Sequence, residues 1–162
     1  ILLYSRGGKA IRFAESGVRE MGRTARGVKG VVLRKTDQLV GMHIIRDESE
    51  NILVVTENGY GKRTPVTGYR CQGRGGQGVI NIKTTQRNGP VVSAFGVKED
   101  SEVIIITEKG KIIRLEASRI RQTVTRGAQG VKLIELGKED KVADMTLVTH
   151  EEAHEETQEI NE

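Results

Sequence analysis

The sequence predicts an all-β fold built from propeller-like repeats of about 51 residues, with four strands in each repeat. Three similar segments begin at Ile1, Ile52 and Val103, so their starts are 51 residues apart on both occasions. Each segment contains short apolar runs separated by glycine-containing turns, a pattern typical of strands. The predicted units are three repeats and an acidic tail that should be disordered: 1–50, 51–101, 102–148 and 149–162.

The first two strands of each repeat are expected to form a hairpin. Strand one is the apolar run at Leu2–Tyr4, Leu53–Val55 or Ile104–Ile106. A two-residue turn follows, and its sequences Gly-Gly and Asn-Gly in the first two repeats favour a type I′ turn. Strand two then carries one arginine in each copy: Arg12, Arg63 and Arg114.

A polar connection leads to the last two strands. Strand three is expected to start at Val28, Val79 or Val131, and strand four spans 39–45, 91–97 or 142–148. Pro65 and Pro90 fall near strand ends, where a missing N–H is tolerated. Propellers typically close with four to eight blades, so three repeats predict a fragment of a larger disc. The start at Ile rather than Met favours the same interpretation.

The stretch GRGGQG, Gly73–Gly78, matches the G-x-G-x-x-G spacing of dinucleotide-binding loops. That function requires a strand before the motif and a helix after it. Here no apolar run precedes it and a strand-like run follows. The equivalent stretches GRTARG and TRGAQG in the other repeats lack the G-x-G spacing. The glycines are therefore predicted to let the main chain turn and approach a phosphate.

The charge distribution indicates a polyanionic partner. The last fourteen residues hold six Glu and no Lys or Arg, so residues 1–148 hold all 26 Lys and Arg against 16 Asp and Glu. The repeats carry net charges of +4, +4 and +2. The scarcity of aromatics, 3%, argues against a base-stacking platform for single strands. A single cysteine, and no signal peptide or apolar stretch near 18 residues, predict a cytoplasmic protein without a membrane partner.

Repetition places equivalent arginines in a row along one outer edge, which could follow the phosphates of duplex DNA. No recognition helix is predicted, so contacts should be to phosphates rather than bases. These arginines could instead be structural, capping carbonyls or bridging neighbouring repeats, and this alternative is stronger for those in the strands than for those in the connections. The candidate DNA-binding residues are Arg19, Arg23, Arg26, Lys29, Arg70, Arg74, Arg121 and Arg126 in the connections, with Arg12, Lys62, Arg63 and Arg114 in the strands. Lys9, Lys83 and Lys132 are further candidates.

Several phrases resemble the C-terminal domain of the A chain of bacterial DNA gyrase (gyrase A). They are NILVVTENGYGKRTPV, GVINIKTTQRNGPVV, ESGVREMGRTARGVKGVVL and DQLVGMHII. The resemblance implies a β-pinwheel, a six-bladed disc whose neighbouring blades exchange strands. It implies a non-catalytic part that wraps duplex DNA on its basic rim, enabling ATP-dependent negative supercoiling by the whole type II topoisomerase. The implied partners are the other blades, the N-terminal part of gyrase A, and gyrase B in an A2B2 heterotetramer.

The same resemblance implies no cofactor in this chain, because ATP and Mg²⁺ are used by other parts of the enzyme. It implies a location in the bacterial cytoplasm at the nucleoid. Two alternatives stay open: the C-terminal domain of topoisomerase IV A, and a protein-binding propeller scaffold. Gln72–Gly78 resembles the family's gyrase A box at five of seven positions, departing at Gly73 and Gln77. Since that box lies in the first blade, its role is not carried over.

No catalytic or metal-binding residue is predicted. Tyr4, Tyr60 and Tyr69 lie inside repeats, so none is interpreted as a strand-cleaving tyrosine. The H-E-x-x-H motif of zinc hydrolases occurs at residues 150–154, but in the acidic tail, without a third histidine or cysteine ligand nearby. The tail itself has two interpretations: it competes with DNA for the arginines, or it only increases solubility.

Overall fold

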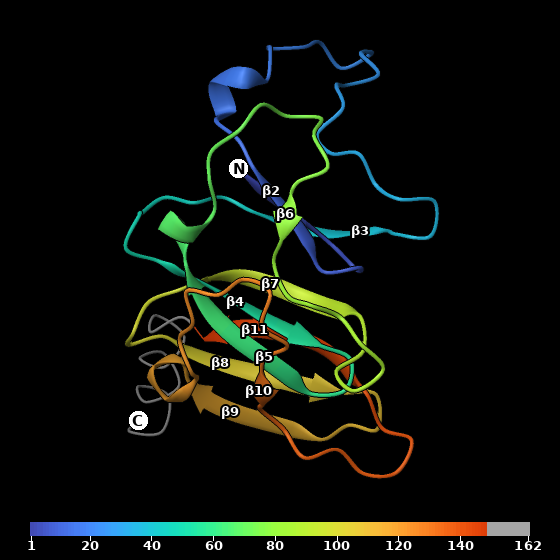
Figure 1. The fold of residues 1–162 in the computed structure, drawn as a ribbon, viewed down its shortest axis with the longest axis vertical. Coiled ribbons are helices and arrows are strands. Elements are labelled where there is room, and N and C mark those ends of the chain that lie inside the picture. The colour runs from blue at the N-terminus through green and yellow to red at the C-terminus, as the bar shows by residue number, and fades with distance from the viewer. Residues whose placement is uncertain (149–162) are drawn as a thin grey trace, which may run out of the picture.

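The computed structural model describes residues 1–148 and contains three antiparallel sheets, confirming the predicted all-β fold (Figure 1). The first sheet has the order β3 (Leu39–His43), β1 (Leu2–Ser5), β2 (Lys9–Arg12), β6 (Val79–Ile80). The second has the order β10 (Val131–Lys132), β5 (Tyr60–Pro65), β4 (Asn51–Thr56), β7 (Val91–Val97). The third has the order β11 (Val142–Val148), β8 (Glu102–Thr107), β9 (Ile112–Glu116). The predicted tail and the H-E-x-x-H motif lie outside the described residues.

A short 3₁₀ turn follows the second strand of each repeat. The three turns are η1 (Glu15–Gly17), η2 (Val66–Gly68) and η3 (Ala117–Arg119). None of the helical segments within residues 1–148 has the length and apolar character needed to cross a membrane.

The third strand of each repeat belongs to the sheet of the preceding repeat. β6, from the second repeat, pairs with β2, and β10, from the third repeat, pairs with β5. A four-stranded sheet is therefore completed only by strand donation between neighbours. The strand predicted from Val28 does not form; its segment contributes one isolated bridge, between Val31 and Gly76.

The hairpin turns differ from the type I′ turns that the sequence predicts. A type I′ turn needs positive φ at both central residues. Only the second residue of each pair has it, with φ of +82° at Gly8 and +80° at Gly59, and the N–H of each donates to the carbonyl three residues earlier. The loop is therefore a tight turn followed by a left-handed glycine. The prediction is wrong because Gly-Gly and Asn-Gly suit both geometries.

The sheets stack on one another, with β4 buried on both faces. Ile52 and Val54 face an apolar cluster shared with the first repeat, while Leu53 and Val55 face a second cluster shared with the third repeat. The strand β7 contacts β3 and β11 along one side of the stack. The donated strands β6 and β10 lie on the opposite side of their sheets. We call this side, with the connections that lead to it, the outer edge.

Replacing Gly78 with Ala should weaken the docking of β6. Gly78 has φ of +69°, and a Cβ there would collide with the carbonyl oxygen of Ala10, on the strand that accepts β6. Both the strained φ and the collision oppose a side chain, so a loss of about 2 kcal/mol or more is expected. Denaturant unfolding measures it. Gly73→Ala, in the same motif but with no atom within 4 Å of its Cβ, is the control and should leave the midpoint unchanged. Equal midpoints would contradict this role of Gly78.

Candidate nucleic-acid interface

A set of exposed basic residues occupies the connections at the outer edge. Arg19, Arg70 and Arg121 each stand two residues after a 3₁₀ turn, so the repeated local structure places them equivalently. All three are exposed, and none makes a side-chain hydrogen bond or ion pair with another residue of 1–148. The first connection adds further exposed cations: Arg23, Arg26 and Lys29. These side chains are free to meet a polyanion.

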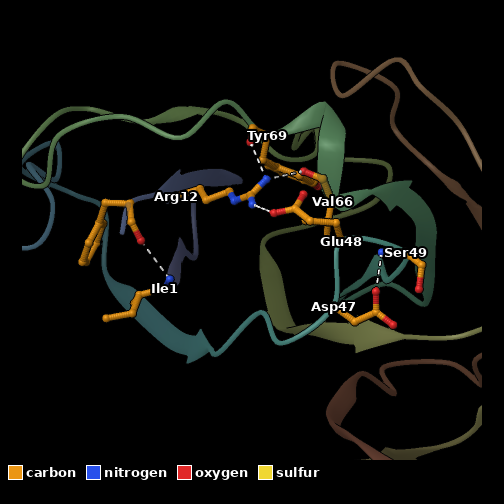
Figure 2. A network of polar contacts seen from close by, with 8 residues as sticks. Ile1, Arg12, Asp47, Glu48, Ser49, Val66 and Tyr69 are labelled. Atoms are coloured by element: carbon orange, nitrogen blue, oxygen red, sulfur yellow. Dashed lines mark hydrogen bonds and ion pairs between the residues drawn. The ribbon is translucent and has the colours of Figure 1, made fainter. Parts of the chain in front are cut away.

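The strand arginines Arg12 and Arg63 join neighbouring repeats instead. The Arg12 guanidinium lies between the second repeat and Glu48, and its Nη1 donates to the carbonyls of Val66 at 3.2 Å and Tyr69 at 3.3 Å, as Figure 2 shows. Only 16% of the Arg12 side chain is exposed. These bonds tie the first repeat to the turn η2 of the second. The structural interpretation therefore fits Arg12 better than DNA binding.

Arg63 repeats this arrangement one junction later. Its Nε donates to the carbonyl of Ile120 at 2.8 Å and its Nη2 to that of Ser118 at 3.3 Å, while Nη1 pairs with Glu99 at 2.8 Å. The side chain is 4% exposed, so the prediction that Arg63 faces DNA is not compatible with its position. The acidic partners Glu48 and Glu99 are also 51 residues apart, a signal that the sequence offered.

Two connection arginines reach back across the same junctions. Arg74 donates to the carbonyls of Gly17 at 2.9 Å and Lys29 at 3.1 Å, and Arg126 donates to that of Gly68 at 2.8 Å. At each junction, one strand arginine of the earlier repeat therefore binds carbonyls of the later repeat, and one connection arginine of the later repeat binds carbonyls of the earlier repeat. Arg74 stays exposed and keeps its charge at the outer edge, whereas Arg126 is half-buried.

Arg114 is the third strand arginine, and residues 1–148 contain no further repeat whose 3₁₀ turn it could bind. It pairs with Glu102 of its own repeat, from Nε at 3.0 Å, and this carboxylate raises the pKa of the guanidinium. More than half of its side chain is exposed. Arg114 is therefore open to solvent, unlike Arg12 and Arg63.

The sequence predicts that Lys62 contacts DNA, but this side chain is only 1% exposed, so it is not one of the exposed cations of the outer edge. Its Nζ donates to the hydroxyl of Thr64 at 2.7 Å. Burial, with a smaller contribution from the charge of Arg126, lowers its pKa to about 8. Of the further candidates, Lys83 and Lys132 are exposed and Lys9 is half-buried.

The glycines of GRGGQG contact the protein's own main chain. The N–H of Gly75 donates to the carbonyl of Gly30 at 2.6 Å, and the carbonyl of Gly76 accepts from Val32 at 2.9 Å. Gly78 is packed against β2. These glycines therefore let the second repeat approach the main chain of the first repeat, and the N–H of Gly75 is used in that contact rather than left free for a phosphate.

Stacked, strand-donating blades with cations along the outer edge define a propeller-type domain suited to a polyanion. The family described as "DNA gyrase C-terminal domain, beta-propeller" matches residues 1–46, 50–98 and 101–149, and the chain belongs to this family. The chain is 46% identical over 160 residues to gyrase A of Staphylococcus aureus, covering 98% of this chain. It spans only 18% of the length of that relative.

Solved structures give the same fold. The structure of the DNA gyrase A C-terminal domain aligns with a TM-score of 0.84 at 28% identity, covering 91% of this chain and 50% of that one. The C-terminal domain of DNA topoisomerase IV aligns with a TM-score of 0.87 at 23% identity, covering 99% and 51%. The second likeness shows the fold alone, whereas the phrases and the family match place the chain with gyrase A.

Proposed function

We propose that this chain binds and wraps duplex DNA along its outer edge, largely independently of sequence. The observation that carries the proposal is the recurrence of Arg19, Arg70 and Arg121, exposed and without a side-chain partner within residues 1–148. Each blade adds one such cation at the same place. A stack of blades therefore presents cations at regular intervals, as a polyanion of regular charge spacing requires.

The energetics favour a contact made through many phosphates. Duplex DNA carries one charge per ~1.7 Å of axis, and each neutralised phosphate releases counterions. Bending a 20–30 bp site costs on the order of 1–6 kcal/mol, which several phosphate contacts can offset. Phosphates carry no sequence information, so affinity should depend steeply on salt and weakly on sequence.

We further propose that the chain acts as the non-catalytic C-terminal part of gyrase A. In that setting its partners are the remaining blades, the N-terminal part of gyrase A, and gyrase B in an A2B2 heterotetramer at the bacterial nucleoid. ATP hydrolysis and Mg²⁺ belong to those other parts. The wrap would then enable negative supercoiling by the whole enzyme. The identity to S. aureus gyrase A supports this assignment.

The test is topological. Closed circular DNA is relaxed by a type I topoisomerase in the presence of increasing amounts of the protein, and the linking number is measured after the protein is removed. Wrapping should shift the distribution in proportion to the protein bound at low salt, and the shift should disappear when salt disrupts phosphate contacts. Binding without any shift in linking number would contradict wrapping.

A protein-binding scaffold is the second candidate, and one observation favours it. Met42, Ile44 and Leu147 are exposed apolar residues that line a common cavity beside β3 and β11. Exposed apolar patches often mark protein interfaces. Binding through this surface would be nearly insensitive to salt, whereas DNA binding through the outer edge would not. Affinity for duplex DNA measured from 50 to 300 mM salt therefore separates the two functions.

A further inference from the structure

A cavity of about 300 Å³ lies at the junction of the second and third repeats. Its walls are Lys62 on β5 and the connection that runs from Arg121 to Val131. The connection supplies two hydroxyl side chains, Thr123 and Thr125, to the lining. The exposed Arg121 stands at its wall, so the cavity has one buried cation and one solvent-accessible cation.

Lys62 belongs to a buried polar network. Its Nζ donates to Thr64, and close by in the same repeat the buried Tyr69 hydroxyl donates to the Oδ1 of Asn81 at 2.6 Å. All four residues are at most 1% exposed. An ammonium group has three N–H donors, and within residues 1–148 only one of those of Lys62 has a protein acceptor.

The network is confined to the second repeat. The residues at the equivalent positions are Ile11, Phe13, Val18 and Gly30 in the first repeat, and Ile113, Leu115, Ile120 and Leu133 in the third. The neighbouring repeats form the same fold with apolar side chains or glycine at these positions, so the fold does not require polar groups there. Since buried polar groups lower stability unless they are satisfied, their joint presence in one repeat indicates a function there.

The two segments around Lys62 contain no carboxylate. Residues 58–98 and 117–134, which include the strand of Lys62 and the connection over the cavity, contain no Asp or Glu. Among residues 1–148 Lys62 has no ion pair, and the like charge of Arg126 lowers its pKa further. With a pKa of about 8 the ammonium is still mostly protonated at neutral pH. A buried cation without a counterion is costly, and a bound anion would offset the cost.

We propose that this cavity binds a phosphate group, with Lys62 and Arg121 as its charged contacts and Thr123 and Thr125 as hydroxyl donors. The Oγ1 of Thr123 accepts from the N–H of Thr125 at 3.2 Å, which leaves its own proton free to donate. Two cations with hydroxyl donors match a tetrahedral oxyanion, which has more acceptor oxygens than a carboxylate. The phosphate could be a free phosphate monoester or a phosphate of the DNA backbone.

The test uses the full chain and inorganic phosphate as the probe, at constant ionic strength, with amide NMR shifts as the readout. Saturable shifts confined to the connection around Thr123 and Gly130 are expected. Lys62→Met, which restores an apolar side chain at this position, should reduce phosphate affinity at least tenfold. It should also raise the melting temperature without phosphate, by about 3 °C or more, because the uncompensated charge is removed.

Two further variants separate loss of the phosphate site from misfolding and from a general loss of positive charge. Arg121→Gln alters an exposed residue and should fold normally while weakening phosphate binding. Lys141→Gln, which removes the same charge at an exposed site paired with Glu57, should bind phosphate like the unmodified chain. Unsaturable shifts, or equal weakening by Lys141→Gln and Lys62→Met, would overturn the proposal.

The source of the phosphate is decided by competition with a short duplex. Displacement of inorganic phosphate by stoichiometric DNA would identify the occupant as a backbone phosphate. Simultaneous binding of both would identify a free phosphate or phosphate monoester, and either result supports the site. The inference does not require the proposed DNA wrapping, because phosphate binding is measured without DNA and can succeed where the topological test fails.

Discussion

Replacing Arg19, Arg70 and Arg121 together with Gln should lower the affinity for duplex DNA by roughly two to three orders of magnitude near 0.1 M salt. It should also make the log–log dependence of affinity on salt shallower by about 2.7, since each phosphate contact contributes about 0.9. Fluorescence anisotropy with a labelled duplex, repeated at several salt concentrations, measures both effects. The stability should hardly change, because all three side chains are exposed and unpaired within residues 1–148.

A matched control removes the same charge elsewhere. Arg46, Lys98 and Lys109 are exposed cations outside the connections that carry the three outer-edge arginines, and their replacement with Gln leaves the net charge equal to that of the first triple variant. Long-range attraction by net charge would weaken with both triple variants. Equal losses in the two proteins would therefore show that no defined row of arginines follows the DNA.

Replacing Arg63 with Ala should lower the free energy of unfolding by about 3 kcal/mol or more. The guanidinium is buried between two repeats, and its loss leaves the carbonyls of Ile120 and Ser118 without this donor. Hydrogen bonds to charged groups contribute about 1.5–3 kcal/mol each, and a buried acceptor left unpaired adds a desolvation cost. Urea unfolding, followed by hydrogen exchange, should show that the third repeat loses protection before the second.

Arg114→Ala is the matched control, because it changes the equivalent residue of the third repeat. Arg114 is exposed and its side chain bonds only Glu102 within residues 1–148, and exposed ion pairs contribute little. Its unfolding midpoint should stay close to that of the unmodified chain. A similar loss of stability in both variants would show that the stabilising effect comes from strand position rather than from the junction.

Much of the fold could be predicted from the sequence because it is local and repeated. The apolar runs of β4 and β8, and of β7 and β11, lie where the 51-residue period predicts them. The partner of β6 could not be derived from the residues themselves. Val79-Ile80 is short, and a donated strand has the same composition as one that stays in its own repeat. Strand exchange between blades was expected only from the resemblance to the gyrase A family, and the order of the strands in the sheets confirms this expectation.

The candidate site was harder to predict, because a junction and a DNA-binding edge give the same spacing of arginines. Arg63 and Arg70 both recur every 51 residues, yet only Arg70 is exposed. Burial separates them, and burial depends on the neighbouring repeat. One signal was present in the sequence: the equivalents of Lys62 are Ile11 and Ile113, which already indicated a buried position.

Strand donation also affects how the chain folds while it is being made. The strands β1, β2 and β3 are complete by residue 43, but β6 ends at residue 80. At synthesis rates of 5–20 residues per second, the edge of β2 stays unpaired for about 2–7 s. During that interval an equivalent strand, such as β10 of another chain, could pair with it. Because β6 leaves the ribosome before β10 of the same chain, the order of synthesis offers β2 its correct partner first.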